Sequence, residues 1–213
     1  MMRICIALFY TVIVLVTCHE VSAQVCKPAT ERTAEVGCWI VANEPLGQFS
    51  ASPVFWHLDV FPTLSAAEAA RASGSAVVQS LGKTWLLTVG DANWRPAGGE
   101  RIAEIGPLPI SPGDRYSAQY LEAIFTPGMT SSVHRHAGPE AWYTLAGETC
   151  LETPDGKFVG RAGGPPVIVP GGQPMHLTAT GTELRRALAG CGNSPSSCDK
   201  GHLVPVVEAD FAG

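Results

Sequence analysis

The sequence predicts an all-β protein whose antiparallel strands pack as a sandwich or barrel. The first reason is composition. The 213 residues include 23 glycines and 17 prolines, and only 15% are charged, which is typical of turn-rich β proteins. The second is a succession of short apolar runs, each ended by glycine, proline or aspartate, which predicts many short strands. The third is that a single segment, 63–72, has a convincing helical pattern.

The N-terminal half is predicted to hold a polar arm, five strands and this helix. The arm covers 24–36, before the first strand. The helix is alanine-rich, has Ser65 and Glu68 at the spacing of a capping box, and stops before Gly74, as helix boundaries require. The strands are predicted at 38–42, 54–60, 76–79, 84–89 and 101–105.

From Tyr116 onward the pattern is one of short strands joined by tight turns. Pro154-Asp155-Gly156-Lys157 is a strong hairpin turn, because Asp and Gly tolerate the backbone angles that such turns need. The strands are predicted at 118–125, 132–136, 141–145, 149–153, 157–161, 166–169, 175–180 and 184–188.

The N-terminus has the features of a secretory signal peptide. Arg3 precedes an apolar run, Ile4 to Val16, and Val21-Ser22-Ala23 offers a cleavage site. We expect cleavage after Ala23 and an exported protein, periplasmic or secreted. The apolar run is short for a bilayer, so no membrane span is expected after cleavage.

Charge excludes one class of partner. The net charge is −5, and no cluster of lysine and arginine provides the basic patch that nucleic acid binding requires. Residues 24–213 are numerous enough for one domain with a sizeable core. A small molecule is the expected partner, for reasons that the metal-ligand pattern described below provides.

The cysteines favour an oxidising compartment, where disulfides form. Removal of residues 1–23 leaves five: Cys26, Cys38, Cys150, Cys191 and Cys198. Cys26 and Cys38 are placed to tether the arm, and Cys191 and Cys198 to close the loop between them. The odd count leaves Cys150 over.

The strongest chemical pattern is a set of histidines with a carboxylate. In a strand, His134 and His136 would lie on one face, because side chains alternate. Glu140 follows an Ala-Gly-Pro turn, and His176 lies downstream. Three imidazoles and a carboxylate form a site suited to a first-row divalent metal.

These residues resemble the two sequence motifs of the cupin superfamily. The first motif is matched without a gap by Gly128, His134, His136, Glu140 and Gly147. The second is matched by Gly164, Pro170, Gly172 and His176, although three residues separate Gly172 from His176 where two are expected, and Thr180 replaces an asparagine.

The resemblance implies a double-stranded β-helix, the jelly-roll barrel, with a metal held by His134, His136, Glu140 and His176. The barrel core would span 116–190, with 24–115 as an extension packing on it and 191–213 as a tail. We favour Mn or Fe as the metal, while the donor set also accommodates Zn, Ni, Co or Cu.

Other residues are candidates for lining the substrate site. Trp142 and Thr144 share the inward face with Glu140 by period two. Of the adjacent Arg185 and Arg186, one is expected to face inward, and Arg185 is our candidate anchor for a substrate carboxylate. Tyr120 and Glu122 share a face, which we expect to be exposed.

Two classes of function remain. The first is a metal-dependent oxidase or oxygenase acting on a small organic molecule, with Glu140 as a candidate proton acceptor. The second is a non-enzymatic protein that uses the metal to bind an acid or sugar, and a metal-assisted isomerase is a further alternative. Cupin barrels often associate through sheet edges, so a homodimer is plausible.

Overall fold

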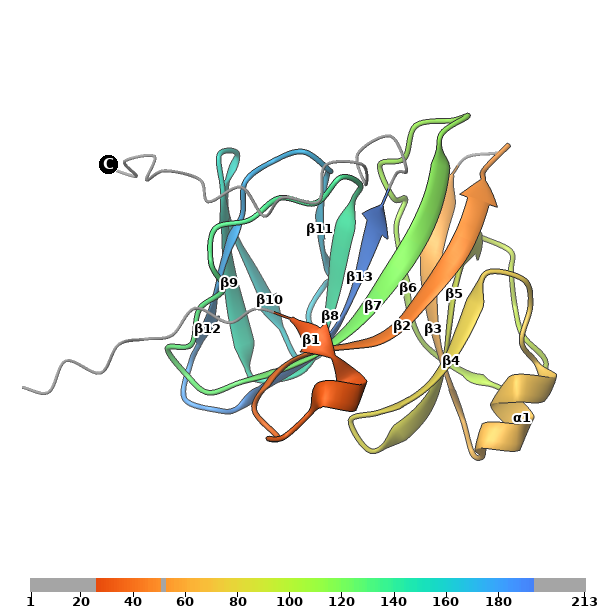
Figure 1. The fold of residues 1–213 in the computed structure, drawn as a ribbon, viewed down its shortest axis with the longest axis horizontal. Helices are drawn as coiled ribbons and strands as arrows, with labels where there is room; N and C mark the ends of the chain where they lie inside the picture. Colours follow the sequence, from red (N-terminus) through yellow and green to blue (C-terminus); the bar gives the residue numbers. More distant parts are fainter. Residues whose placement is uncertain (1–25, 51–52, 194–213) are drawn as a thin grey trace, which may run out of the picture.

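Three β-sheets and two short helices make up the computed structural model, which describes residues 26–50 and 53–193 (Figure 1). The largest sheet has six strands in the order β1-β2-β7-β13-β8-β11. Its strands are β1 (Lys27–Pro28), β2 (Gly37–Gln48), β7 (Arg115–Phe125), β13 (Arg185–Asn193), β8 (Glu140–Ala146) and β11 (Val167–Val169). All its pairs are antiparallel except β1 with β2.

A second sheet faces this one across an apolar core. It has the order β10-β9-β12, with β10 at Gly156–Arg161, β9 at Glu148–Thr153 and β12 at His176–Thr180. A segment before β8 extends it, because Thr130 and His134 form antiparallel bridges with Thr178 and Met175.

This topology is that of a jelly roll. The layer β7-β13-β8-β11 faces a layer formed by the bridged segment, β12, β9 and β10, which is two four-membered sheets in face-to-face packing. Within the described ranges, the strand pairing does not close the two layers into one continuous barrel. The all-β prediction and the double-stranded β-helix are confirmed.

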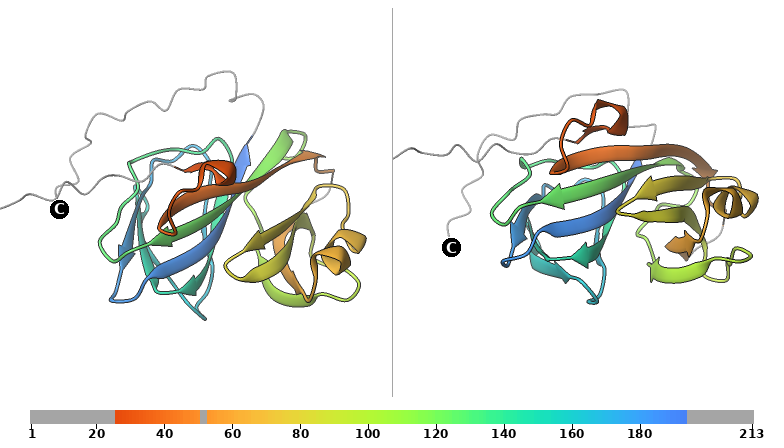
Figure 2. Two further views of the ribbon diagram at one scale, coloured as in Figure 1. Left: turned by 60° about the horizontal axis from the view of Figure 1, so that its bottom comes forward. Right: turned by 90° about the horizontal axis from the view of Figure 1, so that it is seen from below.

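The third sheet comes from the N-terminal half and has the order β4-β5-β3-β6. Its strands are β3 (Val54–Phe61), β4 (Ser75–Ser80), β5 (Lys83–Asp91) and β6 (Glu100–Ile105). The single α-helix, α1 (Leu64–Ala69), and a 3-10 turn, η1 (Ala29–Glu31), complete the described elements. Figures 1 and 2 show this sheet and α1 beside the jelly roll.

A second apolar core joins the N-terminal sheet to the six-stranded sheet. Trp56 and Trp85 come from the former, and Tyr120 and Leu188 from the latter. The rings of Trp56 and Tyr120 stack with centroids 5.9 Å apart. The six-stranded sheet is therefore covered on both faces, like the middle layer of a three-layer structure.

Period-two alternation assigns the two faces of β7. Leu121, Ala123 and Phe125 belong to the core of the jelly roll, whereas Tyr120 and Glu122 lie on the other face, 1% and 3% exposed. The expectation that Tyr120 and Glu122 are exposed is wrong, because the N-terminal half of the chain covers their face.

Two local predictions are also corrected. Residues 132–136 form no regular strand; within them His134 makes an isolated bridge with Met175, just before β12. The N-cap of α1 is Thr63, whose hydroxyl accepts a hydrogen bond from the Ala66 amide at 3.2 Å, so the Ser65–Glu68 capping box is not used.

The cysteine predictions have separate outcomes. A disulfide joins Cys26 and Cys38, as predicted. Cys198 and the predicted signal peptide lie outside the described residues. Among the described helices, none is long and apolar enough to cross a bilayer.

Candidate metal centre

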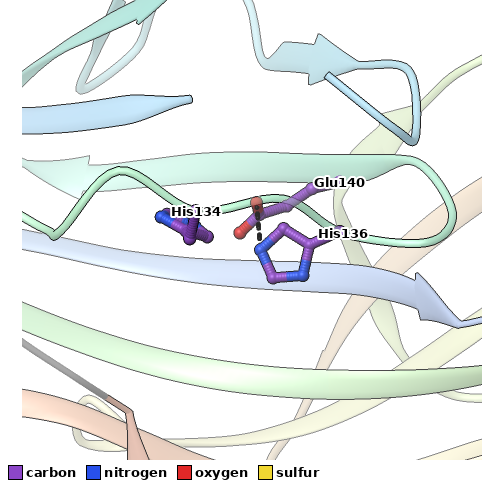
Figure 3. A group of neighbouring side chains, drawn as sticks. All are labelled: His134, His136 and Glu140. Carbon is purple, nitrogen blue, oxygen red and sulfur yellow. Dashed lines mark ion pairs between the residues drawn. The ribbon is translucent and has the colours of Figure 1, made fainter. Parts of the chain in front are cut away.

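Three of the predicted ligands converge at one end of β8. His134 and His136 lie on the irregular segment between β7 and β8, and Glu140 is the first residue of β8. One donor atom from each lies within 4.8 Å of the others. Figure 3 shows the three side chains directed toward a common point.

The orientation of His134 is set by its surroundings. Its Nδ1 donates a hydrogen bond to the Ser132 carbonyl at 2.8 Å, which leaves the Nε2 lone pair available to a metal. Its backbone exchanges two hydrogen bonds with Met175, of 3.0 and 2.9 Å. The segment is therefore held in place despite its lack of regular strand structure.

His136 and Glu140 form the closest pair of donors. His136 Nε2 lies 2.9 Å from Glu140 Oε2, yet this oxygen is buried without a well-formed hydrogen bond in the described structure. Two ligands about 2.1 Å from a metal and at right angles to each other lie about 3 Å apart. The geometry of the pair therefore fits a shared cation.

Burial lowers the pKa values of the two imidazoles, and the negative charge of Glu140 raises them. Burial lowers the pKa of His134, so this ring is neutral, as a metal ligand must be. For His136, burial also opposes protonation, but the nearby Glu140 carboxylate outweighs it and the pKa is raised. A cation would replace the proton that the His136–Glu140 pair attracts.

His176 is not part of this group. Its Nδ1 lies 3.5 Å from Glu152 Oε2 on the neighbouring strand, whereas Met175 and Leu177 beside it belong to the apolar core. A one-residue shift moves a strand side chain to the opposite face. The extra residue after Gly172 thus puts Met175, and not His176, at the inward position.

Glycine allows the loops around the site to approach closely. A Cβ at Gly138 would overlap the carbonyl of Gly192, and the Gly192 amide donates to Pro139 O at 2.7 Å. A Cβ at Gly171 would meet Ala137 O at 2.6 Å. These contacts fix the turn that brings Glu140 back to the histidines.

The candidate lining residues lie inside the jelly roll. Trp142 and Thr144 are both 6% exposed and follow Glu140 on the same face of β8. Arg185 is fully buried, while Arg186 is directed outward and forms an ion pair with Glu35 at 2.5 Å. The pattern of one inward and one outward arginine agrees with the sequence.

Arg185 is an unusual buried charge. Its Nε donates to Thr149 Oγ1, and the guanidinium lies 5.4 Å from the centroid of the Phe125 ring. Both Nη atoms are buried with no hydrogen-bond partner among the described residues. Burial lowers the pKa of Arg185 to about 10, and the Glu140 charge partly opposes this shift.

Cys191 is a residue that sequence reasoning did not connect with the site. Its Sγ lies 4.0 Å from His136 Nε2, and it is directly opposite Glu140 in the pairing of β13 with β8. Burial raises the pKa of its thiol. No motif spacing could reveal it, because only the strand pairing brings β13 beside β8.

A groove lies elsewhere on the described part of the protein. It has a volume of about 660 Å³ and includes Arg32, Ser80, Glu122 and Arg186 among its lining residues, but none of the three donors. Glu122 is held there by Arg32 at 2.6 Å and by Ser80 at 2.5 Å. Its carboxylate is thus satisfied within the protein, unlike Glu140 Oε2.

Comparisons with solved structures return cupins. A cupin superfamily protein from Desulfitobacterium hafniense is 16% identical, with 40% of this chain and 73% of that chain covered and a TM-score of 0.32. A cupin family protein with a double-stranded β-helix from Methanocaldococcus jannaschii is 16% identical, over 38% and 75%, with a TM-score of 0.35.

Oxalate decarboxylase from Bacillus subtilis, described with Mn(II) centres, is 19% identical over 41% of this chain and 24% of that chain, with a TM-score of 0.32. No family model matches the sequence, and no curated protein matches it. The strand order of the jelly roll and the motif at 128–147 agree with these results. The structure shows the jelly-roll fold itself, and the resemblance to the cupin superfamily stays a prediction from the sequence motifs.

Proposed function

We propose that this protein is an exported metal-dependent oxidative enzyme whose substrate is a small carboxylic acid. The proposal depends on one observation. The interior of the jelly roll contains both a buried guanidinium, Arg185, and a buried carboxylate, Glu140. Both Nη atoms of Arg185 are buried without hydrogen-bond partners in the part of the chain described here, and the buried Glu140 Oε2 has only an ion pair with His136 that lacks good hydrogen-bond geometry. A buried polar group without a good hydrogen bond costs free energy. Binding of a metal by Glu140 and of an acid by Arg185 would therefore be favourable.

His134, His136 and Glu140 would hold the metal. Mn and Fe remain our favoured ions, since both accept imidazole and carboxylate ligands, as Zn, Ni, Co and Cu also do. A bound redox metal with open coordination positions can activate a chelating substrate toward oxidation. Three protein ligands leave such positions open.

Side chains of the protein would bind and orient the substrate and accept its proton. Arg185 would bind the substrate carboxylate through its two Nη groups, because a guanidinium fork matches a carboxylate. Thr149, which accepts from Arg185 Nε, would keep that fork in position. Trp142 would form an apolar wall, Thr144 would face the same interior, and Glu140 is the candidate proton acceptor.

Oxygen consumption tests the proposal. Metal-loaded protein would be screened with a panel of small mono- and dicarboxylic acids and matched uncharged alcohols. We expect oxygen uptake with an acid and none with its alcohol, and loss of uptake in His134→Ala. Turnover that does not depend on oxygen would favour an isomerase and contradict the oxidative proposal.

A non-enzymatic binder is the second candidate. Arg185 supports it equally, because a buried guanidinium can hold an acid without any reaction. Calorimetry with the same panel separates the two: tight acid binding by metal-loaded protein with no product after prolonged incubation would favour the binder.

Export and association are separate proposals. The apolar N-terminus supports cleavage after Ala23, and mass spectrometry of protein recovered from its native host would show a mature chain that begins at Gln24. The homodimer is tested by light scattering of the same material.

A further inference from the structure

We propose that Cys191 supplies a sulfur donor to the metal held by His134, His136 and Glu140, which makes the centre a mixed nitrogen, oxygen and sulfur site. The inference rests on the metal of the proposed function and deepens it. It assigns a fourth ligand in place of His176, whose side chain is directed at Glu152.

Strand pairing places Cys191 at the site. Cys191 in β13 is the direct partner of Glu140 in β8, and side chains of directly paired residues project from the same face of a sheet. Both residues are buried, at 1% and 3% exposure. The thiol and the carboxylate are thus adjacent on the interior face.

The distance from Cys191 Sγ to His136 suits a shared ion, while Cys191 lies outside the three-residue group whose donor atoms are all within 4.8 Å of one another. Cys191 Sγ is 4.0 Å from His136 Nε2, and His136 Nε2 is 2.9 Å from Glu140 Oε2. A metal with bonds of about 2.1 Å to nitrogen and 2.3 Å to sulfur would hold those two atoms about 3.6 Å apart at a tetrahedral angle and about 3.1 Å apart at the right angle that fits the His136–Glu140 pair. A movement of about 0.4 to 0.9 Å brings the thiol to such a separation.

A second observation points independently to a ligand at this position. Glu140 Oε2, which is part of the same group, is buried, and its 2.9 Å contact with His136 Nε2 is an ion pair without good hydrogen-bond geometry. A thiol beside a carboxylate whose charge is balanced by a single imidazole is unfavourable in an apolar core. A divalent cation between them would satisfy both.

The binding step conserves all atoms and electrons. The S–H bond of Cys191 breaks, its proton passes to bulk water, and a sulfur–metal bond forms with no change in oxidation state. Sulfur donors favour Fe, Co, Cu and Zn over Mn. Of the two metals named above for oxidative chemistry, the inference therefore selects iron.

The assignment competes with the predicted Cys191–Cys198 disulfide. Cys191 Sγ lies beside His136 in the interior, within the apolar core that includes Trp142 and Met175. A thiol bound to a metal cannot also form a disulfide. Peptide mapping without reductant decides the point, and a Cys191–Cys198 link in mature protein would overturn the inference.

Cobalt(II) is the spectroscopic probe. The mature protein would be titrated with Co(II), alongside Cys191→Ser and the matched control Cys150→Ser. Cys150 is also free of any disulfide with a described cysteine, but it lies on β9. We expect a near-ultraviolet sulfur-to-cobalt charge-transfer band at one equivalent in the unaltered protein and in Cys150→Ser.

In Cys191→Ser we expect weak visible ligand-field bands without the charge-transfer band. Cobalt affinity should fall by at least the roughly 10–100-fold that loss of an outer-sphere partner of a metal ligand costs. A charge-transfer band that persists in Cys191→Ser would overturn the inference.

The cobalt titration distinguishes a wrong assignment of Cys191 from the absence of the metal site. Ligand-field bands with no charge-transfer band in the unaltered protein would remove Cys191 and leave the metal site standing. No cobalt uptake at all would remove both. X-ray absorption of zinc-loaded protein needs no variant and should show one sulfur at about 2.3 Å; nitrogen and oxygen alone would contradict the proposal.

Discussion

At the scale of the residue, Arg185 is expected to lower the stability of the fold while it binds the carboxylate of the substrate. Its side chain is fully buried, and its two Nη atoms lack partners among the residues that the structure describes. Removing a buried charge of this kind and filling its volume with an apolar side chain is often neutral or stabilising. Stability and ligand binding should therefore respond to its replacement in opposite directions.

We predict that Arg185→Met leaves the free energy of unfolding unchanged or raises it, by up to about 3 kcal/mol, because unsatisfied buried donors cost about 1–3 kcal/mol. The same variant should lose binding of carboxylic acids. Denaturant unfolding and calorimetry measure the two effects. Arg186→Met is the control, since Arg186 faces outward, and it should keep acid binding. A destabilised Arg185→Met that still binds acids would contradict this role.

The ligand residues show how far sequence reasoning reaches. The types and spacing of His134, His136 and Glu140 indicate a metal site before any fold is known. His176 shows the limit, because one additional residue after Gly172 reverses which side chain faces inward. Cys191 could not be found at all, since its neighbours depend on the pairing of β13 with β8.

At the scale of the element, β3 contains a buried histidine within a polar network. His57 is fully buried; its Nε2 donates to the Asp91 carbonyl at 2.9 Å, and its Nδ1 accepts from Arg101 at 2.7 Å. Burial, aided by the Arg101 charge, lowers the pKa of His57. The folded protein therefore keeps this imidazole neutral.

This shift predicts the sign of a pH effect. Below the ordinary histidine pKa of about 6.5, the unfolded chain takes up the proton more readily than the folded one, so stability is present above that pH and falls as the pH drops. The contribution of His57 to the free energy of unfolding should therefore decrease between about pH 7.5 and pH 5.5, whereas the raised pKa of His136 contributes with the opposite sign. His57→Gln should reduce this slope, as denaturant titrations would show; an unchanged slope would exclude His57 as a cause.

The arm before β2 is fixed by a covalent element. The Cys26–Cys38 disulfide closes a sequence separation of 12 residues and ties the segment containing β1 and η1 to the start of β2. We predict that the double variant Cys26→Ser/Cys38→Ala loses about 3 kcal/mol of unfolding free energy, the value expected for a loop of this size. Unfolding of the oxidised parent is the reference, and equal stability would contradict the tether.

Elements with strong local patterns were predictable, and those that depend on neighbours were not. The hairpin at Pro154-Asp155-Gly156-Lys157 is present, with Thr153 paired to Gly156. The segment 132–136 is predicted as a strand, yet within it only His134 bridges to a neighbour, Met175.

At the scale of the whole molecule, three sheets share two apolar cores. Trp56 joins the N-terminal sheet to the jelly roll: it is 1% exposed, stacks on Tyr120, and lies 3.4 Å from the position of a Cβ at Gly190. The sequence predicted the helix and strands of this half. The sequence predicted that this half packs on the barrel, but not that it covers the face of β7 with Tyr120 and Glu122, because the polar groups of these two side chains suggested an exposed face.

We predict that Trp56→Ala destabilises the whole protein by about 3–5 kcal/mol, the usual cost of removing a large buried aromatic side chain. Circular dichroism and tryptophan fluorescence should then report the same unfolding midpoint, because the cores unfold together. Two separate transitions would show that the N-terminal sheet and the jelly roll are independent units.

The metal centre is the claim on which the functional account depends, and metal content tests it most directly. Purified mature protein, His134→Ala, His136→Ala and His176→Ala would be loaded with iron(II), dialysed and measured by elemental analysis. The account predicts one equivalent in the unaltered protein and in His176→Ala, and almost none in the other two. Equal retention in all four proteins, or loss confined to His176→Ala, would contradict it.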